Sequence, residues 1–179
     1  RSFKLLLSRY PELHGKVTFL AFLVPSRTHI RQYQRYMEEI QLVIDEINES
    51  FGTPEWQPIR TFLENNYTQA IAGMKIYDVL LVNAVIDGMN LVAKEGPIVN
   101  TKNGVLILSE TIGAHSQLRH SALSVAPADI EGTMQAMYQA LTMNPEERKE
   151  RSDKLVDSIC HEDISDWICK QIEDLQDLL

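Results

Sequence analysis

The regular alternation of two kinds of segment constrains the fold of this chain most. Apolar runs rich in β-branched residues have the length and composition of strands, and they lie at 16–24, 58–64, 78–83, 104–110 and 122–127. Between them, apolar residues recur every three or four positions, as in amphipathic helices. Strands separated by helices favour parallel pairing through right-handed crossovers. The sequence therefore predicts an α/β fold with a Rossmann-like, doubly wound parallel sheet.

Local signals predict where the helices begin and end. The longest helix is expected at 30–51, ended by Gly52. Asn144, followed by Pro145, is typical of a helix start. The run at 16–24 is apolar without alternation, so we expect a strand covered on both faces. Further helices are predicted at 2–10, 67–76, 113–119, about 129–143, from 145 onward and at 163–179.

Composition and charge narrow the class of protein. With 179 residues, 44% hydrophobic and 23% charged, the chain is expected to form one soluble domain. A formal net charge of -8 disfavours nucleic acid as the main partner. No apolar run approaches the roughly 20 residues of a membrane span, and no signal peptide is visible. Cys160 and Cys169 lack metal-ligand spacing, so free thiols in the cytoplasm are expected. The start at Arg1 suggests a fragment or a processed product.

Ligands of open α/β sheets bind beyond the carboxyl ends of the strands. The loops to inspect are therefore 25–29, 65–68, 83–90, 111–114 and 126–129. The most informative stretch is "AVIDGMNLVAKEGP" at 84–97, where an apolar run ends at Asp87-Gly88 and a short helix follows. Gly96-Pro97 is expected to stop this helix after about two turns.

The start of this short helix is expected to bind phosphate. Unpaired backbone amides and the positive end of the helix dipole both favour an anion there. The amides in question belong to Met89, Asn90, Leu91 and Val92. Gly88 lets a ligand approach the backbone, while Asp87 and Glu95 can accept hydrogen bonds from sugar hydroxyls. A nucleotide sugar offers this combination of hydroxyls and phosphates. The alternative is that Asp87 only caps the helix and Gly88 only forms the turn.

A second loop, "VPSRTHI", places Arg27 directly after a strand, where a guanidinium can grip a phosphate with two hydrogen bonds. The alternative is a solvated surface arginine. No cluster of residues has the spacing of a metal site. The histidines are expected to be surface or packing residues and not catalytic bases: His14, His29, His115, His120 and His161.

Several segments resemble the trehalose-6-phosphate synthase family of retaining glycosyltransferases. "DGMNLVAKE" at 87–95 is identical, letter for letter, to a run typical of that family. "ELHGKVTFLAFLVPSR", "INESFGTPEWQPI", "GVLILSE" and "ALTMNPEERKER" are similar to further family segments. The resemblance covers nearly the whole chain. It implies the C-terminal, donor-binding half of a GT-B glycosyltransferase.

The resemblance also implies roles for single residues. Asp87 and the amides of Met89 and Asn90 would hold the donor glucose, the amides of Leu91 and Val92 the diphosphate or ribose, and Glu95 the ribose hydroxyls. Arg27 would grip the phosphate of glucose 6-phosphate. Base recognition would fall near 65–67, where the sequence departs from bacterial members, so UDP, ADP and GDP remain open. No protein residue is assigned as catalytic.

The activity implied by the resemblance is transfer of glucose from a nucleotide sugar, with UDP-glucose the expected donor, to glucose 6-phosphate with retention of configuration. No cofactor or metal is expected. The family's "DRxDxxKG" element and N-terminal half would precede Arg1, so this chain alone is expected to bind weakly, to be inactive, and to associate with that half or with itself. Two alternatives remain: a relative with another acceptor or a non-glycosidic product, as in validoxylamine-phosphate synthases, and a non-catalytic Rossmann-like module.

Overall fold

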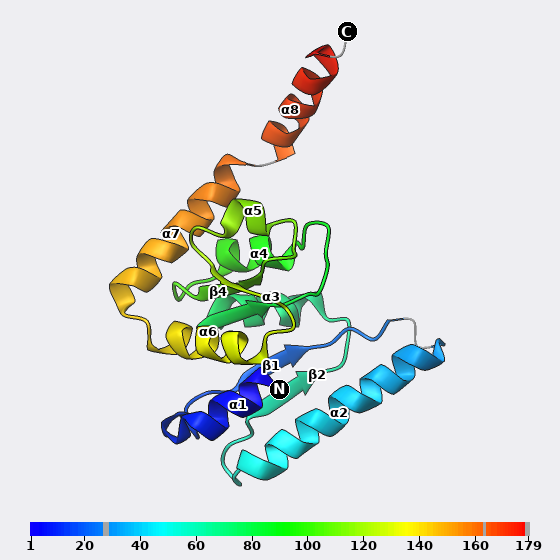
Figure 1. Cartoon of the computed structure of the whole chain (residues 1–179), viewed down its shortest axis with the longest axis vertical. Helices are drawn as coiled ribbons and strands as arrows, with labels where there is room; N and C mark the ends of the chain where they lie inside the picture. Colours follow the sequence, from blue (N-terminus) through cyan, green and yellow to red (C-terminus); the bar gives the residue numbers. More distant parts are fainter. Residues whose placement is uncertain (27–28, 163, 178–179) are drawn as a thin grey trace. The chain divides into compact units, whose positions relative to one another are not determined.

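The computed structural model describes residues 1–26, 29–162 and 164–177. The chain forms two compact units, Arg1–Gly73 and Met74–Leu179, and each is described here by itself (Figure 1). That the whole chain is one domain, as its length suggests, stays a prediction.

The first unit contains two parallel strands with their helices. Its elements are α1 (Ser2–Arg9), the 3₁₀ turn η1 (Pro11–Leu13), β1 (Phe19–Phe22), α2 (Arg31–Phe51), β2 (Ile59–Phe62) and the larger part of α3 (Tyr67–Ile76). β1 and β2 pair in register from Phe19 opposite Ile59 to Phe22 opposite Phe62. The rings of Phe22 and Phe62 stack with their centroids 4.8 Å apart.

The side chain of Asn48 joins the long helix α2 to β2 by two hydrogen bonds. The amide group of Asn48 donates to the carbonyl of Ile59 at 3.0 Å and accepts from the Ile59 backbone amide at 2.8 Å. Ile47 is buried beside it. The helix ends where the sequence predicts, because the amide of Gly52 closes the last turn on the carbonyl of Asn48 at 2.8 Å.

The prediction that the strand at 16–24 is covered on both faces is confirmed only in part. In β1, Leu20 and Phe22 keep 38% and 37% of their surface exposed. Both faces nevertheless have helix contacts, because the ring of Phe3 in α1 lies 5.4 Å from that of Phe19 and a Cβ atom on Gly73 in α3 would lie 2.6 Å from the ring of Phe22.

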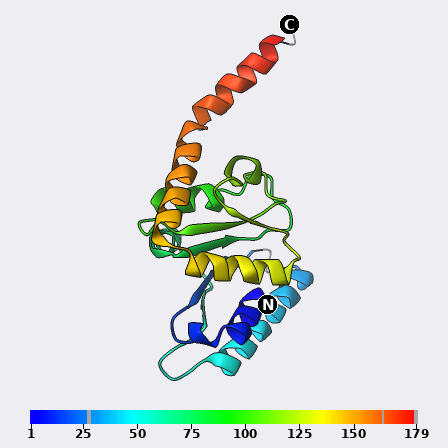
Figure 2. The same cartoon turned by 60° about the vertical axis from the view of Figure 1, so that its left-hand side comes forward.

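The second unit is built on a three-stranded parallel sheet in the order β3-β4-β5. Its elements are β3 (Val79–Val82), α4 (Val92–Val99), β4 (Val105–Ser109), α5 (His115–Leu118), β5 (Leu123–Val125), α6 (Ile130–Thr142), α7 (Pro145–His161) and α8 (Ile164–Asp177). Figures 1 and 2 show α6 along one face of this sheet, and α4 and α7 on the other. The parallel α/β class is thus confirmed.

Each unit contributes its own set of parallel strands, β1-β2 in the first and β3-β4-β5 in the second. Alternating strands and helices predict parallel pairing within each unit, and that pairing is present. The pattern does not determine which strands become neighbours.

The centre of the second unit is β4, in which every residue is buried. The core cluster around it includes Leu106, Leu108, Ile112 and Leu155. Since Ile112 lies in the loop after β4, this core continues directly beneath the carboxyl end of the sheet.

The expected stop of the short helix at Gly96-Pro97 is wrong. The helix α4 continues through both residues to Val99. Its last backbone hydrogen bond runs from the amide of Asn100 to the carbonyl of Gly96 at 3.0 Å. Gly96 is a packing residue, because a Cβ atom there would lie 2.4 Å from Leu80. Pro97 is also buried. The short helix therefore packs closely on β3 although it has only two turns.

The helix start predicted at Asn144 is confirmed, and its side chain accepts from the amide of Glu147 at 2.8 Å. Asn144→Ala is expected to lower the free energy of unfolding by about 1 kcal/mol, because that amide loses its partner. Urea unfolding followed by circular dichroism measures this. The control is Asn65→Ala, at an exposed position with no hydrogen bond among the described residues, where little change is expected. Equal effects of the two substitutions would contradict a capping role for Asn144.

The last helix, α8, has a row of exposed apolar side chains: Ile164, Trp167, Ile168, Ile172 and Leu175. Asp163 and residues 178–179 of the predicted helix lie outside the described residues. None of the helices that the structure describes is long and apolar enough to cross a membrane.

Candidate functional site

The loops that follow β3, β4 and β5 meet at the carboxyl end of the sheet. The hydroxyl of Thr111, after β4, donates to the carbonyl of Val85, after β3, at 2.6 Å. The side-chain amide of Asn83 donates to the carbonyl of Pro127, after β5, at 3.2 Å. These bonds hold the three loops together as one surface, at the position where the fold predicts a ligand site.

Two backbone bonds fix the Asp87–Asn90 segment against the loop after β4. The amide of Gly113 donates to the carbonyl of Asp87 at 3.0 Å, and the amide of Ala114 to the carbonyl of Met89 at 3.1 Å. The contact is so close that a Cβ atom on Gly113 would lie 1.8 Å from the carbonyl oxygen of Gly88. Only glycine allows these two loops to approach in this way.

The Asp87 carboxylate is held by its neighbours within the segment. Its Oδ1 accepts from the amide of Met89 at 3.3 Å, and its Oδ2 accepts from the side-chain Nδ2 of Asn90 at 3.0 Å. The side-chain Oδ1 of Asn90 accepts from the amide of Ala93 at 3.0 Å. The alternative in which Asp87 only caps the helix is therefore wrong, because the capping oxygen belongs to Asn90.

Asn90 has a backbone φ of 71°, in the left-handed region. This conformation is tolerated by asparagine better than by most side chains, and asparagine is also a preferred helix cap. Sequence reasoning assigned Asn90 only a backbone amide. The signal for its side-chain role was the asparagine three residues before Ala93, at a helix start.

The prediction of free amides is correct for three of the four residues. Met89 is the exception, because its amide is occupied by the Asp87 carboxylate. The other three amides, those of Asn90, Leu91 and Val92, have no acceptor among the residues that the structure describes. Gly88 is exposed, and a Cβ atom there would contact nothing within 4 Å. A ligand can therefore reach this stretch of backbone.

The remaining predicted site residues lie outside the Asp87–Asn90 segment. Glu95 lies on α4, half-buried, and its side chain has no hydrogen bond among the described residues. Arg27 lies outside the described residues. The predicted base-recognition segment 65–67 belongs to the first unit, where Asn66 accepts from the amide of Gln69 at 3.0 Å and caps α3.

Three of the described histidines have structural contacts. His14 contacts the carbonyl of Leu7 at 2.9 Å and stacks on Trp56, and His115 contacts the hydroxyl of Ser124 at 2.8 Å. His161 lies at the end of α7, where its bond to the Asp157 carbonyl raises the pKa of the imidazole. Within residues 1–26, 29–162 and 164–177, no group of three or more histidine, cysteine, aspartate or glutamate side chains could hold a metal ion.

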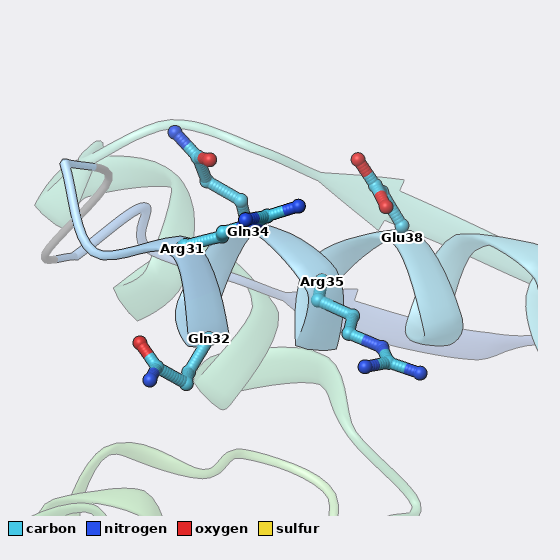
Figure 3. A pocket seen from close by; sticks show the side chains of 5 residues that line it. All are labelled: Arg31, Gln32, Gln34, Arg35 and Glu38. Atoms are coloured by element: carbon cyan, nitrogen blue, oxygen red, sulfur yellow. The ribbon is translucent and has the colours of Figure 1, made fainter.

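Two hollows in the surface are lined by residues other than the Asp87–Asn90 segment. One, of about 520 Å³, lies at the first turns of α2, where its lining side chains point in different directions around the helix (Figure 3). The other, of about 330 Å³, is lined by Asp78, Lys102 and Arg148 near the amino end of β3. Neither hollow has convergent groups like those around Asp87.

A parallel sheet with helices on both faces, and ligand-accessible amides at its carboxyl end, places the chain in the Rossmann-like α/β class. The profile of Glycosyltransferase family 20 matches residues 1–177, and the chain belongs to this family.

Trehalose-6-phosphate synthases are similar to the chain over nearly its whole length. Trehalose-6-phosphate synthase of Citrobacter koseri is 34% identical over 183 residues, which is 99% of this chain and 38% of that protein. A solved E. coli structure bound with UDP-2-fluoro glucose is 33% identical, with a TM-score of 0.90, over 97% of this chain and 39% of its own. A Burkholderia xenovorans synthase in complex with glucose-6-phosphate is 31% identical, with a TM-score of 0.91, over 98% of this chain and 39% of its own. The chain thus spans well under half of these relatives.

Proposed function

We propose that this chain is the donor-binding part of a retaining glycosyltransferase that moves glucose from a nucleotide sugar to glucose 6-phosphate and forms trehalose 6-phosphate. The observation that carries the proposal is the row of three unpaired amides, at Asn90, Leu91 and Val92, beside the Asp87 carboxylate. Family membership and the ligands of the similar solved structures agree with it.

The arrangement suits a sugar diphosphate for physical reasons. The amides at the start of α4, which have no partner within the described part of the chain, can donate to phosphate oxygens, and the helix dipole adds positive charge there. When the donor bond breaks, negative charge grows on the leaving diphosphate, and fixed donors stabilise it without reorganising. Asp87 and Glu95 supply acceptors for hydroxyls of the glucose and ribose. Exposed Gly88 keeps the approach to the backbone open.

We propose UDP-glucose as the donor, in preference to ADP- or GDP-glucose, because relatives from Dictyostelium discoideum and Yarrowia lipolytica are described as UDP-forming. Glucose 6-phosphate is the proposed acceptor, with Arg27 on its phosphate. Neither a metal nor another cofactor is part of the proposal. The rest of a family-length protein would cover the exposed start of α4. Two exposed free thiols, Cys160 and Cys169, fit a cytoplasmic location.

Titration of the chain with UDP-glucose and with UDP, followed by calorimetry, tests the donor site. Binding at roughly millimolar concentration is expected. Asp87→Ala is expected to weaken UDP-glucose about tenfold and UDP much less, because the lost carboxylate contacts the sugar. The control is Asp129→Ala, which removes a capping carboxylate from α6 and should leave both affinities unchanged.

Each result separates the proposed function from its alternatives. If neither ligand binds or shifts the melting temperature, the chain is a non-catalytic module and the proposal fails. If ADP-glucose or GDP-glucose binds more tightly, the donor assignment is wrong. Product analysis of a full-length family protein that contains this sequence separates trehalose 6-phosphate from the product of another acceptor.

A further inference from the structure

Asn90 is the only side chain in the Asp87–Asn90 segment that connects the carboxylate to the helix. One end of its amide donates from Nδ2 to Oδ2 of Asp87 at 3.0 Å. The other end accepts at Oδ1 from the backbone amide of Ala93 at 3.0 Å. A single planar group thus fixes the orientation of Asp87 relative to the first turn of α4.

The two bonds require an amide for a chemical reason. The side chain must accept at one atom and donate at the other, which a neutral carboxamide does and an ionised carboxylate cannot. The left-handed φ of 71° further limits the position to residues such as asparagine, aspartate and glycine. The amide therefore satisfies three constraints at once, of which helix capping is only one.

Asp87 has few other means of keeping its orientation. Its second contact, from the amide of Met89, is long at 3.3 Å. Its other fixed point is the backbone carbonyl, which accepts from Gly113 and does not constrain rotation of the side chain. The position of the carboxylate oxygens consequently depends on Nδ2 of Asn90.

We propose that Asn90 is a positioning residue, whose side chain holds the Asp87 carboxylate toward the hydroxyls of the donor sugar. This inference rests on the proposed function, because it assumes that Asp87 accepts from that sugar. It adds a side-chain role to a residue whose backbone amide alone was assigned to the ligand. It also distinguishes two parts of the donor: the diphosphate depends on backbone amides, and the sugar depends on the Asn90-Asp87 pair.

The test is Asn90→Asp. Aspartate keeps an oxygen to accept from Ala93 and tolerates the left-handed conformation, but it replaces the N–H donor to Asp87 by a second carboxylate oxygen. We expect the affinity for UDP-glucose to fall about tenfold more than the affinity for UDP, because the added negative charge repels the diphosphate of both ligands and only the sugar loses the oriented Asp87. If Asn90 had only a structural role, the affinities for both ligands would fall equally.

The matched control is Asn103→Asp, which makes the same substitution at another left-handed asparagine, with φ of 52°, near the amino end of β3. It should change neither affinity. Asn90→Gly is a second test in case Asn90→Asp folds poorly. Glycine keeps the backbone conformation and removes both side-chain hydrogen bonds, so the affinity for UDP-glucose must fall more than the affinity for UDP. Equal losses for the two ligands, or no loss, would overturn the role of Asn90 while leaving the donor site intact. If the unmodified chain binds neither ligand, the proposed function itself fails, and this inference fails with it.

Discussion

Replacing Gly113 with alanine is expected to lower the free energy of unfolding by about 3 kcal/mol and to abolish detectable UDP-glucose binding. The added Cβ atom would lie 1.8 Å from the carbonyl oxygen of Gly88, which is a backbone atom and cannot rotate away. The two loops must separate, so the bonds from Gly113 to Asp87 and from Ala114 to Met89 are lost. Urea unfolding and calorimetric titration measure the two effects.

Gly88→Ala is the matched control for this prediction. A Cβ atom on Gly88 contacts nothing within 4 Å, and φ is not in the left-handed region, so stability should change by less than about 0.5 kcal/mol. The same methyl group would stand where a ligand approaches the backbone, and we expect UDP-glucose binding to weaken without loss of stability. If Gly113→Ala proves as stable as Gly88→Ala, the close loop contact does not exist in solution.

The order of elements was largely predictable from the sequence, because it depends on local periodicity. β4 is an apolar run that the structure buries completely, and α2 ends at Gly52 as its spacing and glycine indicate. Pairing between strands depends on residues distant in the chain. For that reason, the parallel direction was predicted correctly, whereas the sequence did not indicate which strands are neighbours within each unit.

The candidate site could be located but not constructed from the sequence. The loop after β3 follows from the rule on strand ends, and Asp87 and Gly88 lie there. Which amides stay free depends on where α4 begins, and a capping asparagine moved that start to Val92. The roles of Thr111 and Gly113 arise from contacts with a loop that is remote in sequence, so no local pattern indicates them.

Ile112 supports the same loops from below, and Ile112→Ala is expected to lower the free energy of unfolding by about 2 to 5 kcal/mol. Its side chain is 2% exposed and belongs to the core cluster around Leu108, so truncation leaves a cavity. Ile86→Ala is the control. Ile86 directly precedes Asp87 and is 84% exposed, so its truncation should change the free energy of unfolding by less than about 0.5 kcal/mol.

The bridge between Ile112 and Asp87 is formed by backbone atoms, so the folded fraction of Ile112→Ala should keep its UDP-glucose affinity. Urea unfolding and calorimetry at low temperature measure both quantities. Similar stabilities of the two variants would contradict the packing of Ile112 under the site, whereas loss of affinity in the folded protein would mean that its side chain, and not the backbone bridge, holds Asp87 in place.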